Sequence, residues 1–125
     1  MKNLLLVFLS ILALSGCVAP MTQSEVSAAT YDPLPDDYQV QIKNLILDNL
    51  KDPDSANFKF SSPKKGYTEA TRHFAYIVPV SVNAKNSYGG YTGFQTFYYA
   101  YYGHSFKDVT TGVKLEAVKW SDAIR

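Results

Sequence analysis

The stretch TRHFAYIVPVSVNA, residues 71–84, decides the fold class. Its large apolar side chains fall on every second residue, which is the period of a β-strand. Pro79 has no N–H to donate to a strand ladder, so we expect the strand to lie at an edge there or to be broken by a bulge. The side chains that share one face of this predicted strand are Phe74, Tyr76, Val78, Val80 and Val82.

A second long strand is predicted over residues 93–102, which read GFQTFYYAYY. Phe94, Tyr98 and Tyr102 face one way, and Phe97, Tyr99 and Tyr101 face the other. Because bulk falls on both sides, we expect both faces of the sheet to be at least partly covered. Shorter strands are predicted at 57–60 and 113–120, with a loop over 61–66 and a turn or bulge at 103–105.

An amphipathic helix is expected before these strands. Asp36 is a good N-cap, Gln39 follows three residues later as in a capping box, and Pro53 ends the helix near Lys51. Residues 52–55 are typical of a capped turn or a short 3₁₀ piece. The apolar stripe of the helix comprises Tyr38, Ile42, Leu45, Ile46 and Leu50, widened by Val40 and Leu47. The predicted fold class is therefore α+β, with one N-terminal amphipathic helix packed on a three- to four-stranded antiparallel sheet.

The N-terminus has the pattern of an export signal. Lys2 precedes an apolar run over residues 4–14. As a helix this run would span only about 17 Å, too short for a bilayer core of about 30 Å. It fits the apolar region of a secretory signal instead.

The motif Leu14-Ser15-Gly16-Cys17 resembles the lipobox of bacterial lipoproteins. The resemblance implies that the chain is cut before Cys17, that this residue is acylated, and that its acyl chains hold the protein at a membrane. The alternatives are a plain signal peptide with a chance cysteine and an uncleaved signal anchor. Charge, apolar run, small residues and cysteine occur in the order of a lipobox, which favours the lipoprotein.

Cys17 is the chain's single cysteine, so no intrachain disulfide can form. The predicted organisation is a signal peptide over residues 1–16, a lipidated cysteine and disordered tether over 17–35, and a single α+β domain over 36–125. Val18 follows the cysteine, where an Asp would resemble an inner-membrane retention signal. We therefore expect a periplasm-facing outer-membrane lipoprotein, or one in the inner membrane or the Gram-positive cell membrane if the host differs.

The segment NAKNSYGGYTGF, residues 83–94, is the most informative part of the mature chain. Three glycines in five residues permit positive φ, and Asn and Ser favour turns. The segment is therefore either an elaborate hairpin or a binding loop. The candidate binding residues are Asn83, Lys85, Asn86, Tyr88, Gly89, Gly90, Tyr91 and Gly93.

Two stretches, LKDPDSANF at 50–58 and VNAKNSYGGYTGF at 82–94, together resemble a small domain of uncharacterised bacterial and phage-associated proteins, which are often lipoproteins. The resemblance covers roughly residues 36–102 and implies no particular activity. Many of those proteins have a cysteine shortly before the Val-Asn-Ala-Lys segment. This chain has Val-Pro-Val-Ser at 78–81, so no thiol function carries over.

The sequence offers little catalytic chemistry. Its two histidines, His73 and His104, lie on different predicted elements without metal-ligand spacing, and no Gly-x-Ser-x-Gly motif occurs. Without residues 1–16 the chain has 11 basic and 11 acidic residues, which gives no basic surface for nucleic acid. We predict that the protein is not an enzyme and binds no cofactor or metal.

The predicted function is a non-catalytic interaction or structural module in the cell envelope. Its partners would be the membrane, through acyl chains on Cys17, and an envelope protein or peptidoglycan. One alternative is a glycan- or peptidoglycan-binding module that uses loop and strand tyrosines. Another is a lysozyme inhibitor or a phage or plasmid exclusion lipoprotein.

Overall fold

The computed structural model describes residues 19–121, so Cys17 and the predicted signal peptide lie outside the described residues. In that range no helix is long and apolar enough to cross a membrane. The elements, in chain order, are α2 (Gln23–Ala28), α3 (Tyr38–Leu47), the 3₁₀ helix η1 (Pro53–Ser55), β1 (Asn57–Phe60), β2 (Lys64–Thr68), β3 (His73–Asn83), β4 (Gln95–Tyr102), β5 (Ser105–Asp108), α4 (Thr110–Lys114) and β6 (Lys119–Trp120).

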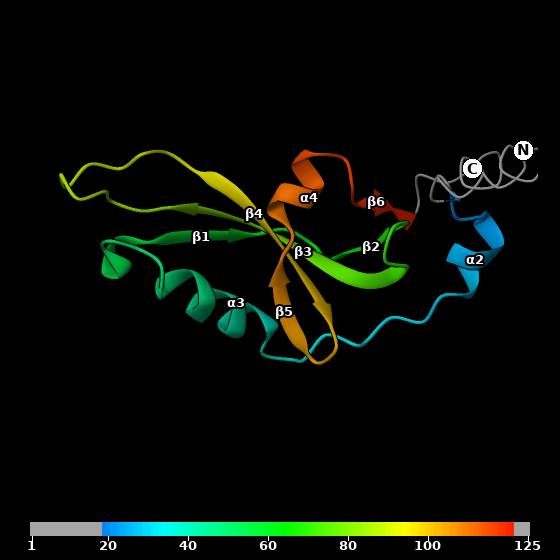
Figure 1. Ribbon diagram of the computed structural model, residues 1–125. Coiled ribbons are helices and arrows are strands. Elements are labelled where there is room, and N and C mark those ends of the chain that lie inside the picture. The colour runs from blue at the N-terminus through cyan, green and yellow to red at the C-terminus, as the bar shows by residue number, and fades with distance from the viewer. Residues whose placement is uncertain (1–18, 122–125) are drawn as a thin grey trace, which may run out of the picture.

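The strands form one antiparallel sheet around β3 (Figure 1). The order is β5-β4-β3-β2-β6, and β1 also pairs with β3. On one side β3 pairs with β4; on the other it pairs first with β2 and then with β1. An α+β fold with an antiparallel sheet is thus confirmed. The sheet has six strands rather than three or four, and α2 precedes α3, so the amphipathic helix is not N-terminal.

Pro79 lies in this central strand, so the first of its two predicted alternatives, an edge strand, is wrong; instead, the ladder is interrupted beside it on the β1–β2 side. The Pro79 carbonyl accepts a 3.0 Å hydrogen bond from the Ser61 amide. The β2 ladder ends opposite Ile77, and the β1 ladder begins opposite Val80. Because the N–H and C=O of a strand residue point to the same side, the missing proline N–H falls in the gap between β2 and β1.

Both faces of the sheet are covered, as the aromatic strand predicts. On one face α3 packs through Ile42 and Ile46, and on the other Val118 and the α4 region cover the sheet. The first cluster contains Val78, Val80, Val82 and Tyr99; the second contains Ala75, Ile77 and Ala100. The helix stripe is narrower than expected, because Leu45 is exposed. The helix is also shorter: it begins after Asp37 rather than Asp36 and ends at Leu47 rather than near Lys51.

Two other predicted elements are only partly right. The expected loop over 61–66 ends at 63, where β2 follows, and the expected strand over 113–120 contains the end of α4 and a turn and is a strand only at Lys119–Trp120. Asp108 Oδ1 accepts from the Thr110 amide at 2.9 Å, and Thr110 Oγ1 accepts from the Tyr98 amide at 3.0 Å. These two bonds turn the chain out of the strand direction, so only Lys119–Trp120 pairs with the sheet.

The N-terminal segment also differs from the expected disordered tether over 17–35. Thr22 and Glu25 form a complete capping box that starts α2. Met21 and Val26 are buried beside Tyr67. The described part of the segment, residues 19–35, therefore packs on the domain, because its few apolar side chains find a place on the sheet face.

Candidate binding hairpin

The predicted binding loop is an extension of the β3–β4 hairpin, which we call the 83–94 hairpin. Lys85 and Tyr91 pair in an antiparallel bridge. Beyond this bridge the Asn86 amide donates to the Gly90 carbonyl at 2.9 Å, and the Gly89 amide donates to the Asn86 carbonyl at 3.1 Å. The segment is thus an elaborate hairpin with its own backbone hydrogen bonds.

Two asparagine side chains hold the turns of the 83–94 hairpin. Asn86 Oδ1 accepts from the amides of Tyr88 and Gly90 at 2.9 and 3.2 Å. Asn83 Oδ1 accepts from the Gly93 amide at 3.1 Å. Gly93 has φ +92°, a conformation that a side chain would strain. The side-chain amides therefore act as local acceptors where the backbone leaves the sheet ladder.

The base of the hairpin is fastened to η1 through one residue, Ser55. Its hydroxyl oxygen accepts from the Lys85 amide at 2.9 Å and itself donates to the Asp52 carbonyl at 2.7 Å. The Tyr91 hydroxyl donates to the Ser55 carbonyl at 3.1 Å. The two stretches that carry the family resemblance, 50–58 and 82–94, thus contact one another.

Aromatic side chains stand out from this braced segment. Tyr88 is 97% exposed, and Tyr91 and Phe94 are about half exposed. Lys85 Nζ lies 5.6 Å from the centre of the Tyr91 ring, and Lys59 Nζ lies 4.3 Å from that of Phe94, which are cation–π distances. The structure therefore brings Lys85 and Tyr91 together and places Tyr88 apart from them. The sequence did not indicate that Ser55 and Lys59 contact the hairpin. Ser55 belongs to the 50–58 motif, from which only a capped turn is predicted.

A shallow pocket of about 180 Å³ lies at the base of the hairpin. It is bounded by the end of the α3 region, including Leu50 and Lys51, and by Lys85 and Asn86 of the hairpin. Val82, Thr92, Gln95 and Phe97 also line it. A hollow therefore lies at the base of the hairpin that carries the exposed aromatic rings.

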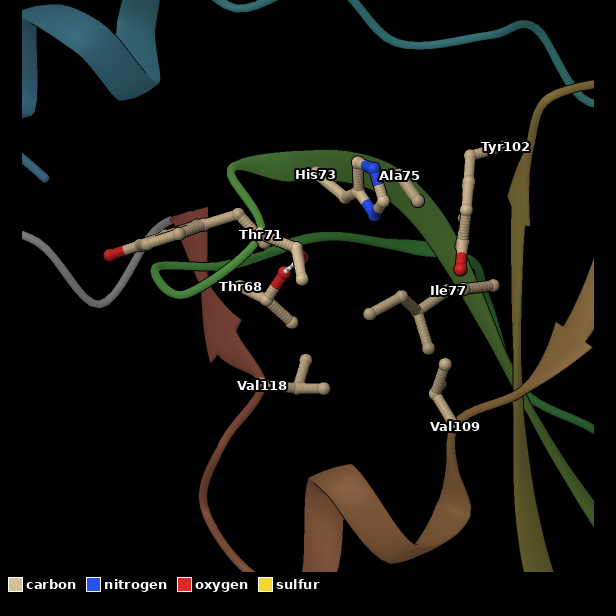
Figure 2. Close-up of a pocket in the computed structure, with 11 residues that line it drawn as sticks. Thr68, Thr71, His73, Ala75, Ile77, Tyr102, Val109 and Val118 are labelled. Atoms are coloured by element: carbon tan, nitrogen blue, oxygen red, sulfur yellow. Dashed lines mark hydrogen bonds between the residues drawn. The ribbon is translucent and has the colours of Figure 1, made fainter. Parts of the chain in front are cut away.

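A separate, mainly apolar pocket of about 180 Å³ lies near the β2–β3 turn (Figure 2). Figure 2 shows His73 and Tyr102 on one side of it and Val109 and Val118 on the other, with the Thr68 and Thr71 hydroxyls hydrogen-bonded to each other. The His73 and Tyr102 rings lie 4.7 Å apart between centres.

Within residues 19–121 no carboxylate lines the His73 pocket. His104 is exposed in the β4–β5 turn, with φ +61°. Among residues 19–121 there is no group of three His, Cys, Asp or Glu side chains placed to hold a metal ion. From the described part of the chain, the His73 pocket offers apolar contact, hydroxyl groups and one imidazole.

Two tyrosines outside the hairpin have a raised pKa. Burial raises the pKa of Tyr67, and Glu69 and Tyr31 add to the effect. Burial likewise raises the pKa of Tyr99, helped by Asp108. Both rings belong to the core clusters, so burial disfavours the ionised form of each phenol.

Comparison of the chain with protein-family models, curated proteins and solved structures gives no match. The likeness to the small uncharacterised domain and the lipobox at residues 14–17 therefore stay predictions. The geometry alone defines the 83–94 hairpin as the candidate site.

Proposed function

We propose that the chain is a lipid-anchored envelope protein that binds a partner, without catalysis, through the 83–94 hairpin. The observation that carries this proposal is Tyr88, which is 97% exposed at the tip of a segment fixed by hydrogen bonds. An exposed aromatic ring on a fixed turn gains apolar contact when a partner covers it. Because the turn is already ordered, binding costs little backbone entropy.

The chemistry of the hairpin suits a protein partner. Tyr88 and Tyr91 each combine an apolar ring with a hydroxyl, and tyrosine is enriched at protein interfaces. Lys85 and Lys59 lie over neighbouring aromatic rings, so each cation stands next to an apolar surface. Such pairs favour a partner that offers carboxylates or carbonyls beside an apolar patch. A glycan that stacks on the same rings is the second candidate.

The anchor is the other half of the proposal. The lipobox at residues 14–17 supports cleavage before Cys17 and acylation of its thiol and new amine. Two or three acyl chains on one residue would hold the protein at a membrane far longer than one chain does, since each buried methylene contributes about 0.8 kcal/mol. Mass spectrometry of the N-terminal peptide from the membrane fraction tests this half directly.

Photo-crosslinking in intact cells tests the partner. A photoreactive amino acid replaces Tyr88 in the full-length chain, and a matched control carries it at Leu115, which is 74% exposed beside α4. We expect a discrete adduct from position 88 and none from position 115. Muramidase digestion then separates the partners: an adduct that keeps its size is protein, and one that collapses is peptidoglycan. Absence of any adduct specific to position 88 would contradict the proposal.

A further inference from the structure

The first described residues of the chain are held tightly against the domain; we call residues 19–32 the strap. The Arg72 guanidinium, in the β2–β3 turn, lies 3.1 Å from Glu25 Oε2 and also donates to the Ala19 carbonyl at 3.1 Å. These two contacts place the start of the strap beside the β2–β3 turn.

Burial holds the strap along the sheet as well. Met21 and Val26 are both buried, in a cluster with Tyr67 and with Phe74 packed against it. The strap therefore shares a core with β2 and β3.

The far end of the strap is fastened at two more points. The Asp32 carboxylate accepts from the Gly103 amide at 2.9 Å, in the β4–β5 turn. Tyr31 and Ser121 share a 2.7 Å hydrogen bond between their hydroxyls. These contacts, together with the buried Met21 and Val26, dock the strap on the domain along its length.

The strap and the 83–94 hairpin lie at opposite ends of the molecule. Arg72 precedes the first residue of β3, and Asn83 is the last residue of the strand. At about 3.3 Å per residue, the 11 residues of β3 separate these ends by about 36 Å. Figure 1 shows α2 at one end of the sheet and the hairpin extending from the other.

We propose that the strap fixes the orientation of the domain on the membrane, with the β2–β3 turn facing the lipid surface and the 83–94 hairpin pointing away from it. The inference rests on the proposed acylation of Cys17. Ala19 follows that residue by two positions, so the chain between them reaches at most about 7 Å. A strap docked this close to its acyl chains gives the β2–β3 end little distance from the headgroups. The hairpin is held more than a strand length farther out.

Fluorescence quenching in vesicles tests this orientation. The full-length acylated protein is inserted into vesicles of phosphatidylethanolamine and phosphatidylglycerol that contain a headgroup-linked quencher. Acylation of Cys17 consumes its thiol, so Ala70→Cys or Ser87→Cys gives one labelling site in the turn or in the hairpin. We expect the label at position 70 to be quenched several-fold more strongly than the label at position 87.

A spacer variant provides the control. An insertion of twelve residues, alternating Gly and Ser, between Val18 and Ala19 adds a flexible span of about 19 Å. It leaves the docked strap unchanged. The difference in quenching between positions 70 and 87 should then shrink markedly. A second variant, Met21→Asp with Val26→Asp, unseats α2 and should have the same effect, with circular dichroism used to verify that the sheet remains folded.

The outcomes separate the inference from the proposed function. If mass spectrometry finds no acyl group on Cys17, both the anchor and the orientation are wrong. If Cys17 is acylated but the two labels are quenched equally, the anchor stands and the fixed orientation is overturned. An unchanged difference in the spacer variant would also overturn it, because the short connection to the strap would then not set the orientation.

Discussion

The backbone amide of Lys85 donates a 2.9 Å hydrogen bond to the hydroxyl oxygen of Ser55, which lies 30 residues earlier in the chain. Through this bond the base of the 83–94 hairpin is joined to η1 rather than only to its own strands. The Tyr91 hydroxyl reaches the same residue through its carbonyl. Ser55 thus connects a local turn to the segment that carries the exposed aromatic rings.

Replacement of Ser55 should loosen the hairpin. Ser55→Ala leaves the Lys85 amide without its acceptor and also removes the donor to the Asp52 carbonyl. Loss of hydrogen bonds of this kind costs about 1–2 kcal/mol of unfolding free energy. Denaturant unfolding measures that loss, and amide hydrogen exchange at Lys85 should be faster. Ser87→Ala, at an exposed position of the same hairpin, should change neither; equal effects from both variants would contradict the role given to Ser55.

Adjacent glycines at the hairpin tip should respond differently to alanine. Gly89 has φ +79°, and a side chain in this left-handed region costs about 1–2 kcal/mol. Gly90 is not in that region, and an added Cβ there would meet only Asn86 Oδ1, at 4.0 Å. Thermal unfolding should show Gly89→Ala clearly less stable than Gly90→Ala. Equal stability of the two variants would show that the tip does not hold the described conformation.

Two positions on α3 provide a matched test of how the helix packs. Ile42 is fully buried against the sheet, whereas Val40 is 56% exposed. Ile42→Ala should lower the free energy of unfolding by about 2–5 kcal/mol through lost burial and a residual cavity. Val40→Ala should change it by no more than about 0.5 kcal/mol. Urea unfolding of both variants makes the comparison. A large loss of unfolding free energy in Val40→Ala would mean that the Val40 face of α3 packs on the sheet, contrary to the structure.

Stability should fall at alkaline pH in part through Tyr67. Burial raises the pKa of its phenol above the unfolded-state value, so the folded state favours the protonated form. The resulting stabilisation is fully present below pH about 10 and is lost as the pH rises through the folded-state pKa. Tyr67→Phe keeps the ring and removes the titration, so its free energy of unfolding should decline less over this range. A decline identical to that of the parent protein would exclude this contribution.

The strand pattern was the most predictable part of the fold. Residues 57–60 form β1 with the predicted bounds, and alternation along 71–84 locates β3 because each of its faces meets a different cluster. Alternation could not show which side of β3 each partner takes. Pro79 is accommodated because the β2 ladder ends before it and the β1 ladder begins after it, and a local sequence pattern cannot show where two other strands end.

Of the other elements, β2 and α4 depend on tertiary contacts, whereas α2 has a local sequence signal. β2 contains Lys64, Lys65 and Gly66 and shows no alternation; Gly66 fits there because a Cβ would lie 2.5 Å from Ile77 Cδ1. The helix α4 begins at Thr110, whose hydroxyl oxygen accepts a hydrogen bond from the Tyr98 amide, 12 residues earlier in the chain. The helix α2 did have a signal, because Thr22 and Glu25 have the spacing of a capping box.

The hairpin form of the 83–94 segment could be predicted from the sequence, but the contacts that brace it could not, and its role in binding stays a prediction. The special residues of the 83–94 segment indicated a hairpin or a binding loop, and the asparagines and glycines do form its turns. The brace by Ser55 joins segments far apart in the chain, and only the folded structure displays it.

The yield of photo-crosslinks from position 88 measures whether the 83–94 hairpin is a pre-ordered binding surface. The measurement compares the parent chain with a chain that also carries Ser55→Ala and Asn86→Ala, which remove the brace and the tip acceptor. We predict a discrete adduct in the parent and at least a several-fold lower yield in the loosened hairpin, at equal protein levels. An equal yield from both chains, or the same adducts from position 115, would show that the ordered hairpin is not a specific binding surface.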